Sequence, residues 1–332
     1  MILHLSADLS SEKVQLVADL TQSIVIKQTN QYVLVTPSKL KEVPAAAQEY
    51  VQESFYMPND MQLASRKYLP TTREVSIDGI NIGGNLGKTM VITGPCSVES
   101  EEQIEQVAQY LVKLGVKVLR AGAFKPRTSP YSFQGLGLDG LKLLAKMREK
   151  YGLKIITEVK DATHVEAVIE YADIVQIGAK AMYDHGILRR CGKTDKAILL
   201  KRGFGTTTQE FVQAAEFILS GGNEKVMLCE RGIRTFEFNT RFTLDLCGAA
   251  YLKEHTNLPI FLDPSHAMGY AYGVPDLSRA CMAMGVEGLL IETHPNPSIA
   301  KSDASQQLDF AQFETMYSSL KAIANAIGRE VV

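Results

Sequence analysis

The 332-residue chain lacks the features that mark membrane-spanning, exported and nucleic-acid-binding proteins. It contains no run of about eighteen apolar residues, so we expect no membrane-spanning segment. Its first residues include neither a basic stretch nor a small-residue cleavage site, which argues against export. A net charge of −2 gives no electrostatic reason to bind nucleic acid or a membrane surface.

Cysteine is scarce, and its spacing shows no disulfide framework. Five cysteines, an odd number, indicate free thiols and a reducing compartment. The apolar fraction of 45% and the charged fraction of 22% are those of an ordinary soluble globular protein. The length is sufficient for a full barrel and a small extra domain. We therefore expect a cytoplasmic protein of enzyme size.

From residue 90 onward, strand-like and helix-like stretches alternate. Eight strands separated by helices imply parallel pairing and predict a closed (β/α)₈ barrel, an α/β fold, over residues 90–332. A doubly wound sheet is the alternative, but it would gather ligand chemistry at one switch point, whereas polar residues here follow nearly every strand. The expected strands are 91–93, 117–120, 155–158, 174–177, 198–201, 226–230, 260–263 and 289–292, and the expected helices include 101–114, 140–151, 209–219, 243–254, 275–284 and 305–327.

The first 66 residues have a different order of strand-like and helix-like stretches, which predicts a small α+β domain of the ferredoxin-like βαββαβ type. Residues 67–89 are expected to form a linker and a β-hairpin with Asp78-Gly79 at its turn. The glycine-rich stretch 83–89 has the wrong glycine spacing for a phosphate-binding P-loop, and a strand follows it, so we interpret it as a turn. In the small domain we expect strands at 2–6, 23–29, 31–36 and 54–57 and helices at 12–22 and about 45–51.

Four potential metal ligands follow the expected strands: Cys96, His266, Glu292 and Asp303. In a barrel the C-terminal ends of the strands converge on the face where active sites are found. A thiolate, an imidazole and two carboxylates are a ligand set for a borderline divalent metal. Any one of them alone could be structural, since cysteine is often a small core residue, but the four together predict a metal site.

Basic residues lie at or near several of the same strand ends: Arg120, Lys125, Lys180, Lys201 and Arg231. Cations that converge on a small site require anions. With neighbouring glycines and hydroxyl groups they form a natural surface for phosphate and carboxylate. We infer more than one phosphorylated substrate. A metal acting as a Lewis acid on a carbonyl is the favoured chemistry, and a Schiff-base aldolase with Lys125 or Lys201 as nucleophile is the alternative.

Six motifs follow one another along the predicted barrel: residues 94–99 (GPCSVE), 125–130 (KPRTSP), 200–203 (LKRG), 229–235 (CERGIRT), 263–267 (DPSHA) and 292–297 (ETHPNP). Together they resemble the motifs of 3-deoxy-D-arabino-heptulosonate 7-phosphate (DAHP) synthases of type Iβ. The resemblance implies a metal-dependent (β/α)₈ barrel that condenses phosphoenolpyruvate with erythrose 4-phosphate in the first step of the shikimate pathway. It also implies Mn²⁺ or a similar ion, such as Co²⁺, Fe²⁺ or Zn²⁺.

The resemblance also assigns roles to individual residues. Lys125 is the implied proton donor, and it is grouped with Cys96 and His266 as catalytic. The implied metal ligands are Cys96, His266, Glu292 and Asp303. The implied phosphoenolpyruvate site comprises Arg120, Lys125, Lys180, Lys201, Arg231 and the backbone of Gly178 and Ala179, and the implied aldose phosphate site comprises Arg127, Thr128 and Ser129.

The chain departs from the family pattern at Lys180, where the family normally has arginine followed by Asn-Met-Gln-Asn. Lysine cannot present a bidentate fork, so we expect phosphate binding at this position to differ. The first 66 residues resemble the regulatory extension of some family members. This implies an aromatic amino-acid effector and a homo-oligomer, a tetramer, although the domain could instead merely aid assembly.

Two other functions are alternatives for this sequence. A 3-deoxy-D-manno-octulosonate 8-phosphate synthase would use arabinose 5-phosphate and normally carries Lys-Ala-Asn-Arg-Ser-Ser where this chain has Lys-Pro-Arg-Thr-Ser-Pro at 125–130. That difference favours the DAHP synthase. A barrel that binds ligands without turnover is the other alternative, and the presence of all four metal-ligand residues argues against it.

Overall fold

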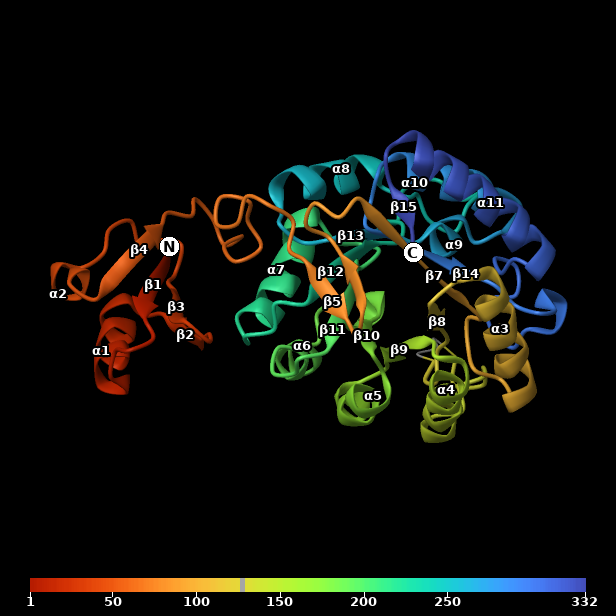
Figure 1. Cartoon of the computed structure of the whole chain (residues 1–332), viewed down its shortest axis with the longest axis horizontal. Helices are drawn as coiled ribbons and strands as arrows, with labels where there is room; N and C mark the ends of the chain where they lie inside the picture. Colours follow the sequence, from red (N-terminus) through yellow and green to blue (C-terminus); the bar gives the residue numbers. More distant parts are fainter. Residues whose placement is uncertain (126–128) are drawn as a thin grey trace.

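The computed structural model describes residues 1–125 and 129–332. It contains a large barrel and a small N-terminal sheet with its helices, joined by an extended segment (Figure 1). None of the helices in these residues is long and apolar enough to cross a bilayer.

Eight parallel strands form the barrel, and each pairs with the next along the chain. Pairing of the last strand with the first closes the circle, with Gly288 opposite Met90 and Glu292 opposite Gly94. The predicted closed (β/α)₈ barrel is therefore confirmed. The strands are β7 (Lys88–Gly94), β8 (Val118–Arg120), β9 (Lys154–Val159), β10 (Ile174–Ile177), β11 (Ala197–Lys201), β12 (Val226–Glu230), β13 (Ile260–Leu262) and β14 (Gly288–Glu292).

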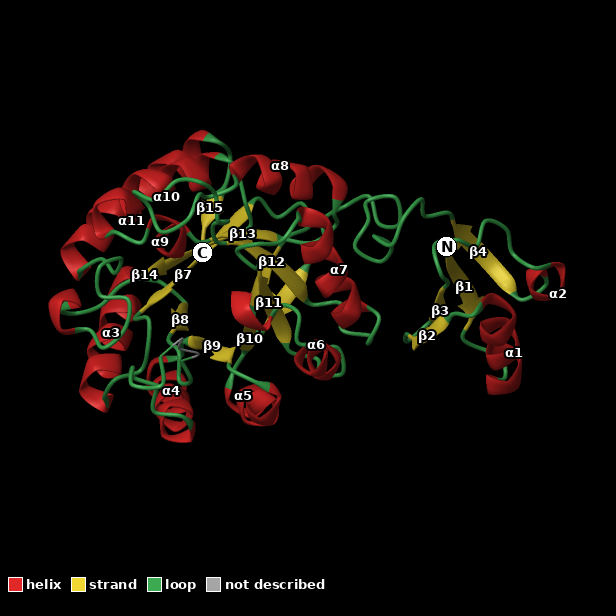
Figure 2. Cartoon of the chain, turned by 180° about the vertical axis from the view of Figure 1, so that it is seen from behind, coloured by secondary structure: helices red, strands yellow, loops and turns green. Residues whose placement is uncertain are grey.

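Helices surround the strands on the outside of the barrel (Figure 2). The first of them, α3, begins after Ser100, whose hydroxyl accepts a hydrogen bond from the backbone N–H of Gln103, and ends at Gly115 in the left-handed conformation. Its apolar face is buried against the strands. The outer helices are α3 (Glu101–Leu114), α4 (Leu138–Tyr151), α5 (Val165–Tyr171), α6 (His185–Cys191), α7 (Thr208–Leu219), α8 (Leu246–His255), α10 (Val274–Ala283) and α11 (Phe310–Ala326).

Several short elements complete the barrel. The helix α9 (Pro264–Met268) directly follows β13, and β15 (Glu330–Val331) pairs with the first residues of β7. Single 3₁₀ turns occur at η1 (Ala162–His164), η2 (Ala179–Ala181), η3 (Ala271–Gly273) and η4 (Pro297–Ile299).

A β-hairpin closes the N-terminal end of the barrel. Strands β5 (Val75–Ile77) and β6 (Ile80–Ile82) are joined at Asp78-Gly79, and both turn residues have positive φ, as this turn type requires. The apolar residues of the hairpin pack against interior side chains of the barrel such as Phe261. Asp78 pairs with Lys154 at the start of β9, which places the hairpin at the N-terminal end. The C-terminal ends of the strands, at the opposite end of the barrel, remain open for a site with polar residues.

The N-terminal part is a four-stranded antiparallel sheet in the order β2-β3-β1-β4. The expected helix at 45–51 is a single turn, because Val51 already pairs with Leu5 beyond a β-bulge. The last strand therefore begins earlier than the expected 54–57. The elements are β1 (Ile2–Ser6), α1 (Ser11–Thr21), β2 (Ile24–Lys27), β3 (Gln31–Val35), α2 (Ala45–Gln48) and β4 (Val51–Phe55).

A buried carboxylate ties the connecting segment to the barrel. Glu216 of α7 accepts hydrogen bonds from the backbone N–H groups of Gln62, Leu63 and Ala64 at 2.6, 3.1 and 2.9 Å. Burial outweighs these three donors and raises the pKa of Glu216 from 4.5 to about 7. The folded protein therefore holds a proton that the unfolded chain releases between these two pH values.

This linkage predicts a pH dependence of stability. Because the folded state binds the proton more tightly, the contribution of Glu216 is fully present below pH 4.5 and is lost as pH rises towards about 7. Urea unfolding from pH 5 to 8 should show that the wild-type free energy of unfolding, relative to that of Glu216→Gln, decreases with pH and levels off above about 7. Parallel pH curves for the two proteins would contradict this assignment.

Candidate active site

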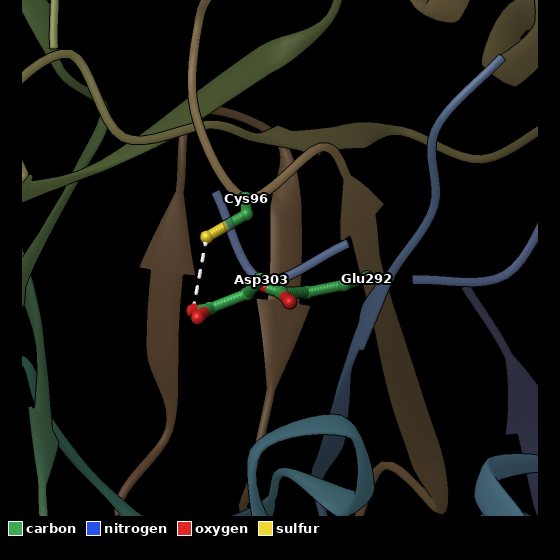
Figure 3. Close-up of side chains that lie close together, drawn as sticks. All are labelled: Cys96, Glu292 and Asp303. Atoms are coloured by element: carbon green, nitrogen blue, oxygen red, sulfur yellow. Dashed lines mark hydrogen bonds between the residues drawn. The ribbon is translucent and has the colours of Figure 1, made fainter. Parts of the chain in front are cut away.

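Three of the four expected metal ligands meet at the open end of the barrel. Cys96 follows β7, Glu292 ends β14, and Asp303 lies in the loop after β14 (Figure 3). The sulfur atom and one oxygen of each carboxylate all lie within 4.8 Å of one another. The Cys96 thiol donates a hydrogen bond to Asp303 Oδ2 at 3.3 Å.

The fourth residue, His266, adjoins this cluster from α9. Its Nε2 lies 3.6 Å from Glu292 Oε1, and its Nδ1 lies 2.8 Å from Asp263 Oδ2. Asp263 also accepts a hydrogen bond from the backbone N–H of His266 at 2.9 Å, so it caps the helix as well as lying against the ring. A carboxylate behind a histidine in this way orients the imidazole toward a metal.

Two glutamines that the sequence did not single out hold the cluster in place. Gln306 donates to Glu292 Oε2 at 2.6 Å, and Gln307 accepts from the backbone N–H of Cys96 at 2.9 Å. Asp303 in the same loop has a φ of 45°, which is uncommon for a residue with a side chain. No strand-end pattern marks amides in a loop, so only the folded structure shows their role.

Cations contact the same acidic groups. Lys125 Nζ lies 3.0 Å from Cys96 Sγ, and the Arg120 guanidinium forms an ion pair with Glu292 Oε1. Lys201 pairs with Asp263 Oδ2 at 2.5 Å. All three side chains are buried, and the charges of Arg120 and Lys201 are each compensated by a carboxylate.

The pKa values of the cluster divide its members into two kinds. Burial would raise the pKa of Glu292 and of Asp303, but the positive charge near them, first of all that of His266, holds both below their ordinary values. The Cys96 thiol behaves in the opposite way, because burial and the charge of Glu292 raise its pKa to about 12. The carboxylates are therefore ionised at neutral pH, and the thiol keeps its proton unless a cation replaces it.

This donor set fits a borderline divalent cation. Sulfur, imidazole nitrogen and two carboxylates are the ligands that such ions share, and the cysteine ionises on binding the metal. The residues that could hold the ion are Cys96, His266, Glu292 and Asp303.

A cavity of about 460 Å³ opens beside the cluster. The predicted substrate residues that line it are Lys125, Ser129, Gly178, Ala179, Lys180, Lys201 and Arg231. Arg120 lies beneath, paired with Glu292, and Arg127 and Thr128 lie outside the described residues.

Several lining residues were not predicted. Glu158 is the last residue but one of β9 and could have been found by the strand-end rule. Its Oε1 would lie 2.1 Å from a Cβ at Gly178, so a larger residue there would require the Glu158 side chain to move. Phe204 and Phe242 come from loops without such a signal, as does Arg241, whose Nη1 lies 3.4 Å from Asp303.

The sequence around this cavity is similar to those of known proteins. Residues 60–329 match the sequence profile of the DAHP synthetase I family. The chain belongs to this family. The predicted resemblance is thereby confirmed, and the chain is an enzyme of the aldolase and transferase kind.

Individual relatives agree with this membership. Phospho-2-dehydro-3-deoxyheptonate aldolase of Thermotoga maritima is 46% identical over 81% of this chain and 79% of its own. The crystal structure of that aldolase matches with a TM-score of 0.81 at 40% identity, over 100% of this chain and 99% of that one. A 2-dehydro-3-deoxyphosphooctonate aldolase of Francisella tularensis is 31% identical over 74% of this chain and 94% of its own. Membership therefore rests on most of the chain rather than on a few motifs.

The geometry of the cluster makes a testable prediction for Cys96. Replacing Cys96 by serine should weaken binding of Co²⁺ by roughly tenfold or more, because a hydroxyl is a poor ligand beside a thiolate. The thiolate-to-cobalt absorption in the near ultraviolet should disappear in Cys96→Ser and persist in Cys247→Ser, whose cysteine is exposed. An unchanged spectrum in Cys96→Ser would place the metal elsewhere.

Proposed function

We propose that this enzyme condenses phosphoenolpyruvate with erythrose 4-phosphate to give DAHP and inorganic phosphate, the first step of the shikimate pathway. The observation that carries the proposal is a single cavity bordered by the Cys96–Glu292–Asp303 cluster on one side and by Lys201 and Arg231 on the other. The name of the 46% identical relative supports it.

The cationic side of the cavity suits phosphoenolpyruvate. Lys201 ends β11, Arg231 directly follows the neighbouring strand β12, and both side chains are buried. Both side chains line the cavity together with Lys180 and the backbone at Gly178 and Ala179, and a surface of this kind suits a ligand that carries a phosphate and a carboxylate. Ser129 lines the same cavity and is proposed to bind the aldose phosphate. Arg127 and Thr128 are proposed for the same phosphate from the sequence motif alone.

Cys96, His266, Glu292 and Asp303 would hold a divalent ion, Mn²⁺ or a similar ion such as Co²⁺, Fe²⁺ or Zn²⁺. When bound, such an ion supplies Lewis acidity toward an aldehyde oxygen. Asp263 keeps His266 oriented, and Gln306 keeps Glu292 oriented, so the ligands are arranged before the substrates arrive.

Lys125 lies between the metal ligands and the anion-binding side. In the reaction, carbon 3 of phosphoenolpyruvate bonds to the aldehyde carbon, water adds at carbon 2, and the C–O bond to phosphate breaks. The Lys125 ammonium, 3.0 Å from Cys96 Sγ, is placed to donate a proton to the alkoxide that forms at the aldehyde oxygen. The Schiff-base route is less well supported, because Lys201 is paired with Asp263 and Lys125 contacts Cys96.

The proposed substrate pair is tested by turnover. Purified protein with Mn²⁺ and phosphoenolpyruvate should consume erythrose 4-phosphate in preference to arabinose 5-phosphate. Lys125→Met should lower kcat by roughly 10²–10⁴-fold if it is the proton donor. Lys113→Met on the outer helix α3 is the matched control and should leave kcat unchanged. Preference for arabinose 5-phosphate would favour the octulosonate reaction, and no turnover of either aldose would favour a binding-only barrel.

We infer that residues 1–66 form a ferredoxin-like regulatory domain, that 67–89 are the linker and hairpin, and that 90–332 are the catalytic domain. The strand order β2-β3-β1-β4 and a separate apolar cluster that includes Leu3, Val17 and Leu34 support the first assignment. An aromatic amino acid is the proposed effector, and a homotetramer is the proposed assembly. The five free cysteines support a reducing, cytoplasmic location.

Deletion of residues 1–59, which precede the segment matched by the family, tests the regulatory role. An effector inhibits only if it favours an arrangement that binds substrate poorly, so removing its domain should abolish inhibition and spare turnover. Inhibition by phenylalanine and tyrosine is compared between the full-length and the shortened enzyme. Inhibition that survived the deletion, or a full-length enzyme insensitive to both amino acids, would refute the assignment.

A further inference from the structure

Two buried arginines near the end of β12 have opposite surroundings. The Arg202 guanidinium donates to Glu230 and to Asp245, both at 2.9 Å, so its charge is compensated within the protein. Arg231 is 5% exposed and lines the cavity, and its buried Nη1 has no hydrogen-bond partner among the residues that the structure describes. A buried donor without a partner is costly unless a ligand completes it.

An aromatic ring takes the place of an acidic partner. The central carbon of the Arg231 guanidinium lies 4.3 Å from the centre of the Phe242 ring. A cation over an aromatic face is stabilised by the ring quadrupole, whereas the guanidinium N–H groups lie in its own plane and stay available. A carboxylate in the position of Phe242 would instead occupy those donors and neutralise the charge.

The backbone around Phe242 is fixed on both sides. Its N–H donates to Ala267 O at 2.8 Å, and the neighbouring Thr243 exchanges two backbone hydrogen bonds with Ile233 at 2.9 and 3.0 Å. Gly232 leaves the space that the side chain needs, because a Cβ there would lie 2.6 Å from Phe242 Cβ. The ring is therefore held between β12 and α9, the helix that carries His266.

A second pair repeats the arrangement. The Phe204 ring lies 5.6 Å from that of Phe242 with an angle of 27° between their planes, and the Arg234 guanidinium lies 4.8 Å from the Phe204 ring. Arg231, Phe242, Phe204 and Arg234 all line the cavity, and together they make an arginine–aromatic wall. Within it, Arg231 is the buried cation and Arg234 is exposed.

We propose that Phe242 is a positioning residue that keeps Arg231 buried without an acidic partner and thereby sets the affinity for phosphoenolpyruvate. The inference rests on the proposed function, in which Arg231 binds this substrate. In this role Phe242 acts through Arg231, which binds the substrate in the ground state and in the transition state alike. Such an effect changes KM and leaves kcat unchanged.

Substitutions at Phe242 separate this role from packing. Leucine fills much of the volume without a π face, and tyrosine keeps the face. Phe242→Leu should raise KM for phosphoenolpyruvate about five- to tenfold, with kcat within about twofold and KM for the aldose unchanged, while Phe242→Tyr should stay near wild type. Phe238→Leu is the control, because that ring is 87% exposed in the same loop. Equal KM values for wild type and Phe242→Leu would overturn the inference.

A double-mutant cycle and direct binding complete the test. In an Arg231→Lys background, Phe242→Leu should add little further loss, whereas additive losses would show that Phe242 acts independently of Arg231.

Calorimetric titration with phosphoenolpyruvate alone separates the positioning role of Phe242 from the proposed function of the enzyme. If wild type binds it without turning over an aldose, the proposed function fails, and weaker binding by Phe242→Leu still supports the positioning role. Wild type that binds no phosphoenolpyruvate overturns both, and circular dichroism checks that each variant is folded.

Discussion

The structure depends on pairing of buried charges at the C-terminal end of the barrel. Arg120 pairs with Glu292 and Lys201 with Asp263, and these four side chains are almost inaccessible to solvent. An unpaired charge at such a depth would cost several kcal/mol, so removal of either partner would leave the other destabilised. The barrel makes this pairing feasible, because it brings the ends of all eight strands to one place.

The two ends of the barrel differ because the charged residues are concentrated at one of them. The apolar hairpin β5–β6 closes the opposite end, and the cluster of ionised residues lies where the strands end. At the open end the acidic groups and the cations lie on adjoining sides of one cavity. One arginine, Arg231, is held by a ring rather than by an acid, and its buried Nη1 has no hydrogen-bond partner among the described residues.

Much of this arrangement could be predicted from the sequence, for identifiable physical reasons. Buried parallel strands are short apolar runs, so β10 and β12 have the expected bounds, and the residue type just after a run points to the site. That rule located Cys96, His266 and Glu292. The helix expected at 243–254 begins later, at Leu246, because Thr243 pairs with Ile233 and Asp245 caps the helix.

What could not be predicted arises from contacts between loops far apart in the chain. Gln306 and Gln307 act on residues that precede them by 14 and 211 positions, and nothing in their local sequence indicates it. The Phe204–Phe242 stack likewise joins two separate loops. Local pattern fixes where a strand ends, but only the closed barrel decides which loop side chains meet across its mouth.

We propose that Cys96, His266, Glu292 and Asp303 form one metal site beside the cavity that is lined by cations. A crystal structure of the Mn²⁺-loaded protein, with anomalous differences recorded at the manganese edge, would test this arrangement. We expect one strong peak bounded by these four residues. A peak bound by other residues, or a fully occupied Mn²⁺ that Cys96 does not touch, would contradict it.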